Sequence, residues 1–169
     1  MKLIYYPNEF LDKKVKEVNI DSPEFDPKEI KDKMLDIMLN NGGIGLSANQ
    51  VGLDAQVFIM GTSKVDATMC INPVVLQHTE DTTLETEGCL SFPNYFVKVR
   101  RPKEILATWY DENLEQKKSK IEGYTTKVFL HEWDHLQGVT FKDRVSRMKW
   151  DMAKKKAMKL RKKYAWYRY

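Results

Sequence analysis

Residues 131–138 read His-Glu-Trp-Asp-His-Leu-Gln-Gly, and the whole chain contains only three histidines. On an α-helix, positions i and i+4 share one face, so His131 and His135 can point at a single ligand. Glu132 lies about 100° round the same helix, within reach of a water molecule held there. This H-E-x-x-H spacing is typical of metal-dependent hydrolysis. It predicts a helix with two metal ligands and one acid–base group; the alternative is an ordinary amphipathic helix that contains two histidines.

The third metal ligand is sought by elimination. Phe141 stands where one zinc-peptidase pattern has a further histidine, and no glutamate follows His135 to serve a second pattern. The remaining candidates are Cys70, His78 and Cys89. Cys89 is preferred because a glycine precedes it and permits close backbone approach. One thiolate and two imidazoles suit Zn²⁺ or Fe²⁺ and leave a position for water. Cys70, in a β-like run, and His78, in a polar loop, are interpreted as structural residues.

The rest of the chain indicates an α+β order. A helix is predicted from Asp26-Pro27, with Asp at the N-cap and Pro at the first helical position, to residues 40–43. Another is predicted after Val145, where apolar residues from Trp150 to Tyr164 recur at helical spacing. The predicted strands lie at residues 56–60, 69–76, 96–100 and 105–110. We therefore expect mixed or antiparallel sheets around a central helix over residues 124–138.

Length and composition set the broad class. The 169 residues fit one domain, 1–169, that can bury a core without disulfides. We expect no membrane span and no signal peptide, because long apolar runs are missing. Two cysteines favour a reducing cytoplasm.

Charge is distributed unevenly along the chain. Residues 144–169 hold eleven Lys or Arg and one Asp, whereas the preceding part has an acidic excess. The segment 146–169 is thus predicted to be a basic C-terminal helix. It is either a solvated amphipathic helix or a helix that docks on RNA phosphates through Lys154–Lys156 and Arg161–Lys163.

Three blocks, in this order, carry a resemblance to the peptide deformylase family. Residues 43–50 (Gly-Ile-Gly-Leu-Ser-Ala-Asn-Gln) resemble its G-x-G-L-A-A-x-Q motif, residues 87–91 match E-G-C-L-S, and residues 131–135 match H-E-x-x-H. The resemblance covers about residues 3–145. Two departures occur: Ser47 replaces the first alanine, and Leu130 stands where a glutamine often precedes the first histidine.

The resemblance implies removal of the formyl group from the initiator methionine of new polypeptides. Glu132 would transfer the proton, while the Gln50 amide and the Leu90 backbone N–H would stabilise the developing oxyanion. One metal ion per chain is implied, Fe²⁺ first, with Ni²⁺, Co²⁺ or Zn²⁺ as substitutes. Its ligands would be Cys89, His131 and His135.

Substrate and partners follow from the same resemblance. The N-formylmethionyl nascent chain would add as a strand beside Ile44 and Gly45. Ile44, Val128 and the region around Leu90 would form an apolar pocket for methionine; the alternative for Val128 is an ordinary core position. Independently of the resemblance, Arg101 either pairs with Glu87 and holds the cysteine segment or is an ordinary surface residue. We expect a monomer, and if the basic helix docks on RNA, the resemblance implies that the partner is the ribosome, where the substrate emerges.

The sequence leaves two alternatives to a deformylase. One is a non-catalytic ribosome- or RNA-binding protein on a deformylase-like scaffold; it is disfavoured because the implied metal ligands, the acid–base residue Glu132 and Gln50 are all present. The other is a zincin-like endopeptidase, which lacks its downstream ligand.

Overall fold

The computed structural model describes the backbone of residues 1–165 and the side chains of residues 1–163. Residues 166–169 of the predicted C-terminal helix, and the predicted packing of Tyr164, lie outside this part. The helices are α1 (Pro27–Asn40), α2 (Tyr124–Leu136) and α3 (Arg147–Ala165), with short 3-10 helices η1 (Glu9–Asp12), η2 (Ala48–Val51) and η3 (Phe141–Arg144). The strands are β1 (Gly45–Ser47), β2 (Val57–Met60), β3 (Thr68–His78), β4 (Thr82–Cys89), β5 (Phe92–Pro102), β6 (Glu104–Tyr110) and β7 (Gln116–Glu122).

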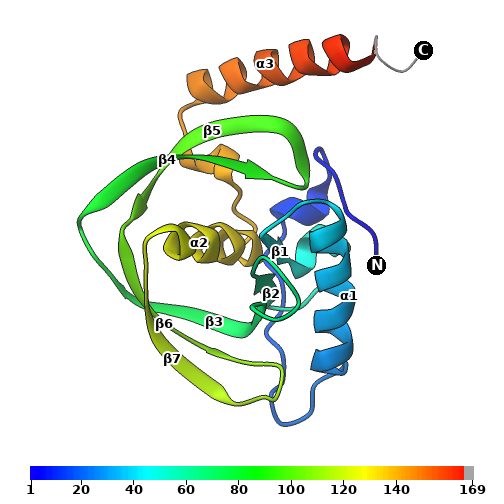
Figure 1. The fold of residues 1–169 in the computed structure, drawn as a ribbon, viewed down its shortest axis with the longest axis vertical. Coiled ribbons are helices and arrows are strands. Elements are labelled where there is room, and N and C mark those ends of the chain that lie inside the picture. The colour runs from blue at the N-terminus through cyan, green and yellow to red at the C-terminus, as the bar shows by residue number, and fades with distance from the viewer. Residues whose placement is uncertain (166–169) are drawn as a thin grey trace.

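Two antiparallel sheets enclose α2. The larger has the strand order β1-β2-β3-β6-β7, and the smaller pairs β4 with β5. In Figure 1, α2 lies between the two sheets, α1 runs along one side, and α3 lies outside β5. The predicted α+β class, with antiparallel sheets around the histidine-bearing helix, is confirmed.

The helix α2 is central because it is apolar on the face opposite its histidines. Phe129 is fully buried and meets the ring of Phe58 on β2 edge-on, with 5.0 Å between ring centroids. The chain leaves the helix at Gly138, which has φ +71°, and a β-carbon there would overlap the backbone of Asp12 and Lys14. Only glycine fits this exit. The core of the larger sheet therefore fixes which face of α2 looks toward β4 and β5.

The helix α3 packs against β5 through one face. Trp150 and Ala153 are buried, as predicted, and the Trp150 ring stacks on Tyr95 at 5.1 Å between centroids. The outward face carries lysines and the exposed side chains of Met148 and Met152. None of the described helices combines the length and apolar character that a membrane crossing requires.

The sequence missed three strands and misplaced one residue. Strands β1, β4 and β7 were not predicted. His78, which the sequence placed in a polar loop, is the last residue of β3, although it is exposed as expected. The extended conformation reaches this polar residue because it pairs with Ile105 of β6.

Candidate active site

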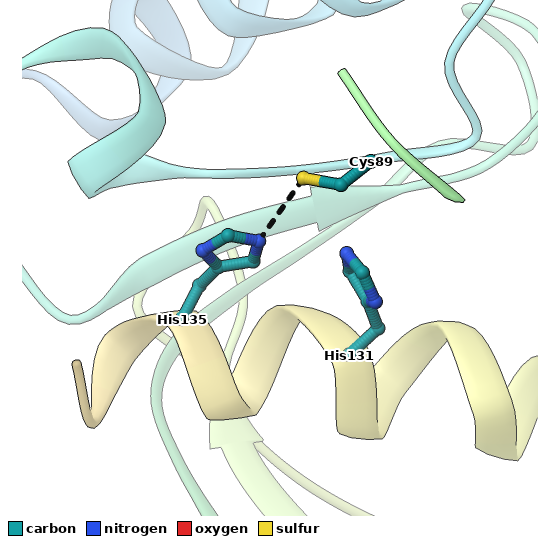
Figure 2. A group of neighbouring side chains, drawn as sticks. All are labelled: Cys89, His131 and His135. Atoms are coloured by element: carbon teal, nitrogen blue, oxygen red, sulfur yellow. Dashed lines mark hydrogen bonds between the residues drawn. The ribbon is translucent and has the colours of Figure 1, made fainter. Parts of the chain in front are cut away.

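Three side chains that could hold a metal ion converge between α2 and the end of β4. Figure 2 shows Cys89 reaching from its strand toward His131 and His135, which project from successive turns of α2. One donor atom from each residue lies within 4.8 Å of the other two, and Cys89 Sγ is 3.3 Å from His135 Nε2. The structure therefore brings together the three predicted ligands.

The other two ligand candidates lie elsewhere. Cys70 is fully buried in β3 within the apolar cluster that contains Phe58 and Phe129. His78 is exposed at the end of the same strand. Among the described residues, neither belongs to a group of metal-ligating side chains.

A buried network of charges orients His131. Its Nδ1 lies 2.8 Å from Glu87 Oε2, which leaves Nε2 to face Cys89 and His135. Arg101 donates from Nε to Glu87 Oε1 at 2.8 Å and from Nη1 to Asp134 Oδ2 at 2.6 Å. The predicted pair between Arg101 and Glu87 is thus present, with both side chains almost fully buried. A carboxylate that orients a ligating imidazole in this way is common at metal sites.

Sequence reasoning missed Asp134 and Arg144. Arg144 donates from Nε to Asp134 Oδ2 at 2.9 Å, so that carboxylate pairs with two guanidinium groups. The sequence contained a signal for Asp134, because this residue directly precedes the second histidine on a helix that was predicted to be central. A carboxylate buried at such a position needs a cationic partner.

The protonation of these groups fits a bound cation. Burial disfavours the charge on Glu87, but hydrogen bonds to His131 and Arg101 outweigh it and lower the pKa of Glu87 to about 2. Burial likewise opposes the charge on His131, yet its hydrogen bonds to Cys89 and Glu87 raise its pKa well above the ordinary value. Burial and the neighbouring His131 lower the pKa of His135 well below its ordinary value, so this imidazole is neutral, which is the form that binds a metal ion. One sulfur and two imidazole nitrogens are a donor set that binds Zn²⁺ or Fe²⁺.

Glu132 and Gln50 flank the three donors. Glu132 is almost fully buried; burial raises its pKa, and a hydrogen bond from Ser47 opposes that shift. Gln50 Nε2 donates to Cys89 Sγ at 3.2 Å and to Ser91 Oγ at 3.1 Å. Glu132, a potential proton carrier, and Gln50, an amide donor, therefore both lie beside the space between the three candidate metal ligands.

These residues open onto a pocket of about 370 Å³. Its apolar wall includes Ile44, Leu90 and Val128, all of which the sequence had indicated. Ile44 is partly exposed at the rim and leads into β1. Other lining residues, not predicted, are Phe92, Asn94, Tyr95, Phe96, Tyr124 and Lys127. An extended peptide could lie along this pocket with its end against the donor cluster.

A helix with H-E-x-x-H, a cysteine donor and an adjacent amide donor define the protein class as a metal-dependent hydrolase. The family model described as polypeptide deformylase matches residues 1–151. The chain belongs to the polypeptide deformylase family and is an enzyme that removes the N-terminal formyl group from newly made polypeptides.

Individual relatives agree with this assignment. The chain is 37% identical over 131 residues to the peptide deformylase of Thermotoga maritima, covering 78% of this chain and 79% of that one. It superposes on a peptide deformylase from Legionella pneumophila with a TM-score of 0.86 and 28% identity, covering 97% and 96% of the two chains. A Synechococcus elongatus deformylase, solved in complex with actinonin, gives a TM-score of 0.83 and 32% identity over 92% and 85%.

Proposed function

We propose that deformylation in this enzyme is carried out by the cluster of Cys89, His131 and His135 together with Glu132 and Gln50. The observation that carries the proposal is their convergence: the three donor atoms lie within 4.8 Å of one another, and Gln50 Nε2 is 3.2 Å from Cys89 Sγ. Cys89, His131, Glu132 and Gln50 line the pocket, and His135 is fully buried one helical turn after His131. The chemistry that these side chains supply is metal binding, proton transfer and hydrogen-bond donation to an oxygen.

The three donors would hold one divalent cation. When bound, the cation supplies Lewis acidity and lowers the pKa of a coordinated water toward neutrality. We propose Fe²⁺ as the native ion, with Ni²⁺, Co²⁺ or Zn²⁺ as substitutes. The donor chemistry accommodates all four, and the preference for iron comes from the family resemblance.

Glu132 is the proposed proton carrier. Its carboxylate lies in the pocket wall one residue after His131, where it can take a proton from water and deliver it to the departing amine. Gln50 Nε2 and the backbone N–H of Leu90 would donate hydrogen bonds to the formyl oxygen as negative charge develops on it. Leu90 follows Cys89 directly, at the turn between β4 and β5, so its backbone adjoins the donor cluster.

The formylmethionyl substrate would bind along β1. On one side β1 pairs with β2, and the residues Ile44 and Gly45 also border the pocket. Main-chain hydrogen bonds to these two residues would hold an extended peptide without reading its sequence. The apolar side chains of Ile44, Leu90 and Val128 would enclose the methionine side chain.

Outside the pocket, we propose that α3 docks on ribosomal RNA, near the emerging substrate. Lys155, Lys156 and Arg161–Lys163 are exposed on this helix, whereas its Trp150 face is buried against β5. The proposed arrangement is one domain, 1–169, acting as a cytoplasmic monomer, with residues 146–169 serving as the basic helix.

The substrate assignment is tested by measuring anaerobic release from matched peptides. Protein loaded with Fe²⁺ or Ni²⁺ should release formate from formyl-Met-Ala-Ser and should release no acetate from acetyl-Met-Ala-Ser, because a formyl group is smaller and more electrophilic. Cleavage of internal peptide bonds instead of formate release would favour the endopeptidase alternative and overturn the proposal.

A further inference from the structure

Ser47, the last residue of β1, contacts Glu132 although 85 positions separate them in the chain. Its side chain is fully buried. Ser47 Oγ lies 2.6 Å from Glu132 Oε2 and 3.0 Å from the Glu132 backbone oxygen. A hydroxyl has one hydrogen to donate, and the nearer, negatively charged oxygen is the stronger acceptor. The hydroxyl therefore donates to the carboxylate.

The other carboxylate oxygen is confined by Gly45, two residues earlier on the same strand. A β-carbon on Gly45 would overlap Glu132 Oε1, so the carboxylate occupies the space that the glycine leaves free. One oxygen is thus held by a hydrogen bond and the other by close packing against backbone. Together these contacts restrict the Glu132 side chain, which otherwise rotates about three bonds.

Ser47 also holds the proposed oxyanion donor, but through its backbone. The Ser47 N–H donates to Gln50 Oε1 at 2.9 Å, which turns Gln50 Nε2 toward Cys89 Sγ. The two contacts of Ser47 are chemically separable. Removing the hydroxyl leaves the backbone N–H and its hydrogen bond to Gln50 Oε1 in place.

We infer that Ser47 is a positioning residue: its hydroxyl fixes the carboxylate of Glu132 in the orientation needed for proton transfer. The inference rests on the proposed role of Glu132. The family motif that residues 43–50 resemble has alanine at this position, so the motif itself does not require the hydroxyl.

The expected effect is confined to turnover. Ser47 does not line the pocket, so its hydroxyl contributes nothing to contacts with the bound peptide. Misplacing a catalytic group by even about 1 Å can cost a factor of about 100 in rate. Because Gly45 still confines one oxygen, we expect Ser47→Ala to lower kcat by about tenfold and to leave KM unchanged.

The experiment compares four Ni²⁺-loaded proteins by formate release: the parent, Ser47→Ala, Glu132→Asp and the double variant. The shorter side chain that Glu132→Asp introduces cannot reach the hydroxyl, so Ser47→Ala should change the rate of the Glu132→Asp protein by no more than about twofold. Thr126→Val is the matched control. It removes another fully buried hydroxyl, one that donates to Lys103 O at 3.2 Å, away from the pocket.

The inference is overturned if Ser47→Ala keeps the parental kcat, if it acts on KM, or if its effect is equally large in the Glu132→Asp protein. It is also overturned if Thr126→Val lowers kcat as much, because loss of any buried hydroxyl would then suffice. Bound nickel and thermal midpoint should match between Ser47→Ala and Thr126→Val. Absence of formate release from the parent itself would instead refute the proposed function.

Discussion

Arg101 and Glu87 form a two-point ion pair in the interior, with 2.8 Å between Arg101 Nε and Glu87 Oε1 and 3.1 Å between Nη2 and Oε2. Glu87 in turn holds His131 Nδ1 at 2.8 Å. The orientation of His131, a proposed metal ligand, thus depends on Arg101, which does not line the pocket and acts on His131 only through Glu87.

Arg101→Ala should weaken metal binding and destabilise the fold. Removing the guanidinium leaves Glu87 with a buried, uncompensated charge, which costs about 3 kcal/mol in unfolding free energy. Loss of such an outer partner typically lowers metal affinity by about 10–100-fold. Denaturant unfolding and competition with a chelator measure the two effects. Arg100→Ala, at an exposed position next to it on β5, is the control. Unchanged metal affinity in the Arg101 variant would refute this account.

Gly45→Ala should abolish most activity while the metal stays bound. The added β-carbon would occupy the position of Glu132 Oε1 and displace the carboxylate. A displaced proton carrier should lower kcat by at least about 100-fold. Formate release and metal analysis of the same sample test this. A variant with parental turnover would show that the orientation of Glu132 seen here is not the active one.

The two cysteines should differ sharply in reactivity. Burial raises the pKa of Cys70 well above its ordinary value, so that thiol stays neutral and unreactive through mildly alkaline pH, whereas Cys89 is partly exposed in the pocket. At pH 8 the metal-free native protein should take up one alkyl group from iodoacetamide, on Cys89, and added Ni²⁺ should protect it. Cys89→Ser should take up none. Alkylation of Cys70 in the native protein would contradict the burial seen here.

Ribosome binding through α3 should depend steeply on salt. Reversing charge at exposed Lys155, Lys156 and Lys162 should weaken it at least tenfold at 0.1 M salt, because phosphate contacts release counterions. Charge reversal is a cleaner test than truncation, since deleting α3 would also remove buried Trp150. The same reversals at Lys117, Lys118 and Lys120 of β7 are the control. Sedimentation with ribosomes across a salt series measures the effect; salt-independent binding would refute the proposal.

The helices and the two histidine donors were predictable from the sequence because their signals are local, whereas Cys89, 46 residues before His135, was assigned by elimination and by the family resemblance. The capping residue Asp26 accepts from Lys28 N and Glu29 N, as predicted, and the histidine spacing specifies one face of α2. Strands β2 and β6 were also predictable, because they lie against the core and their own sequences are rich in apolar residues.

The missed elements carry weak local signals. Strand β7 reads Gln-Lys-Lys-Ser-Lys-Ile-Glu, and its extended conformation comes from pairing along the edge of the larger sheet rather than from its own apolar residues. Strand β4 is similarly polar, and β1 has only three residues. The bonds from Ser47 to Glu132 and from Arg101 to Asp134 join residues far apart in the chain, so only the tertiary fold reveals them.

Formate release by the Ni²⁺-loaded parent and by Glu132→Ala, with bound metal measured in both samples, tests the central claim most directly. We predict that the parent releases formate from formyl-Met-Ala-Ser. The variant should bind the same amount of metal and lose at least about a factor of 100 in turnover. Turnover by the variant near the parental rate, or no release by a parent with its Cys89, His131 and His135 site fully occupied, would contradict the account.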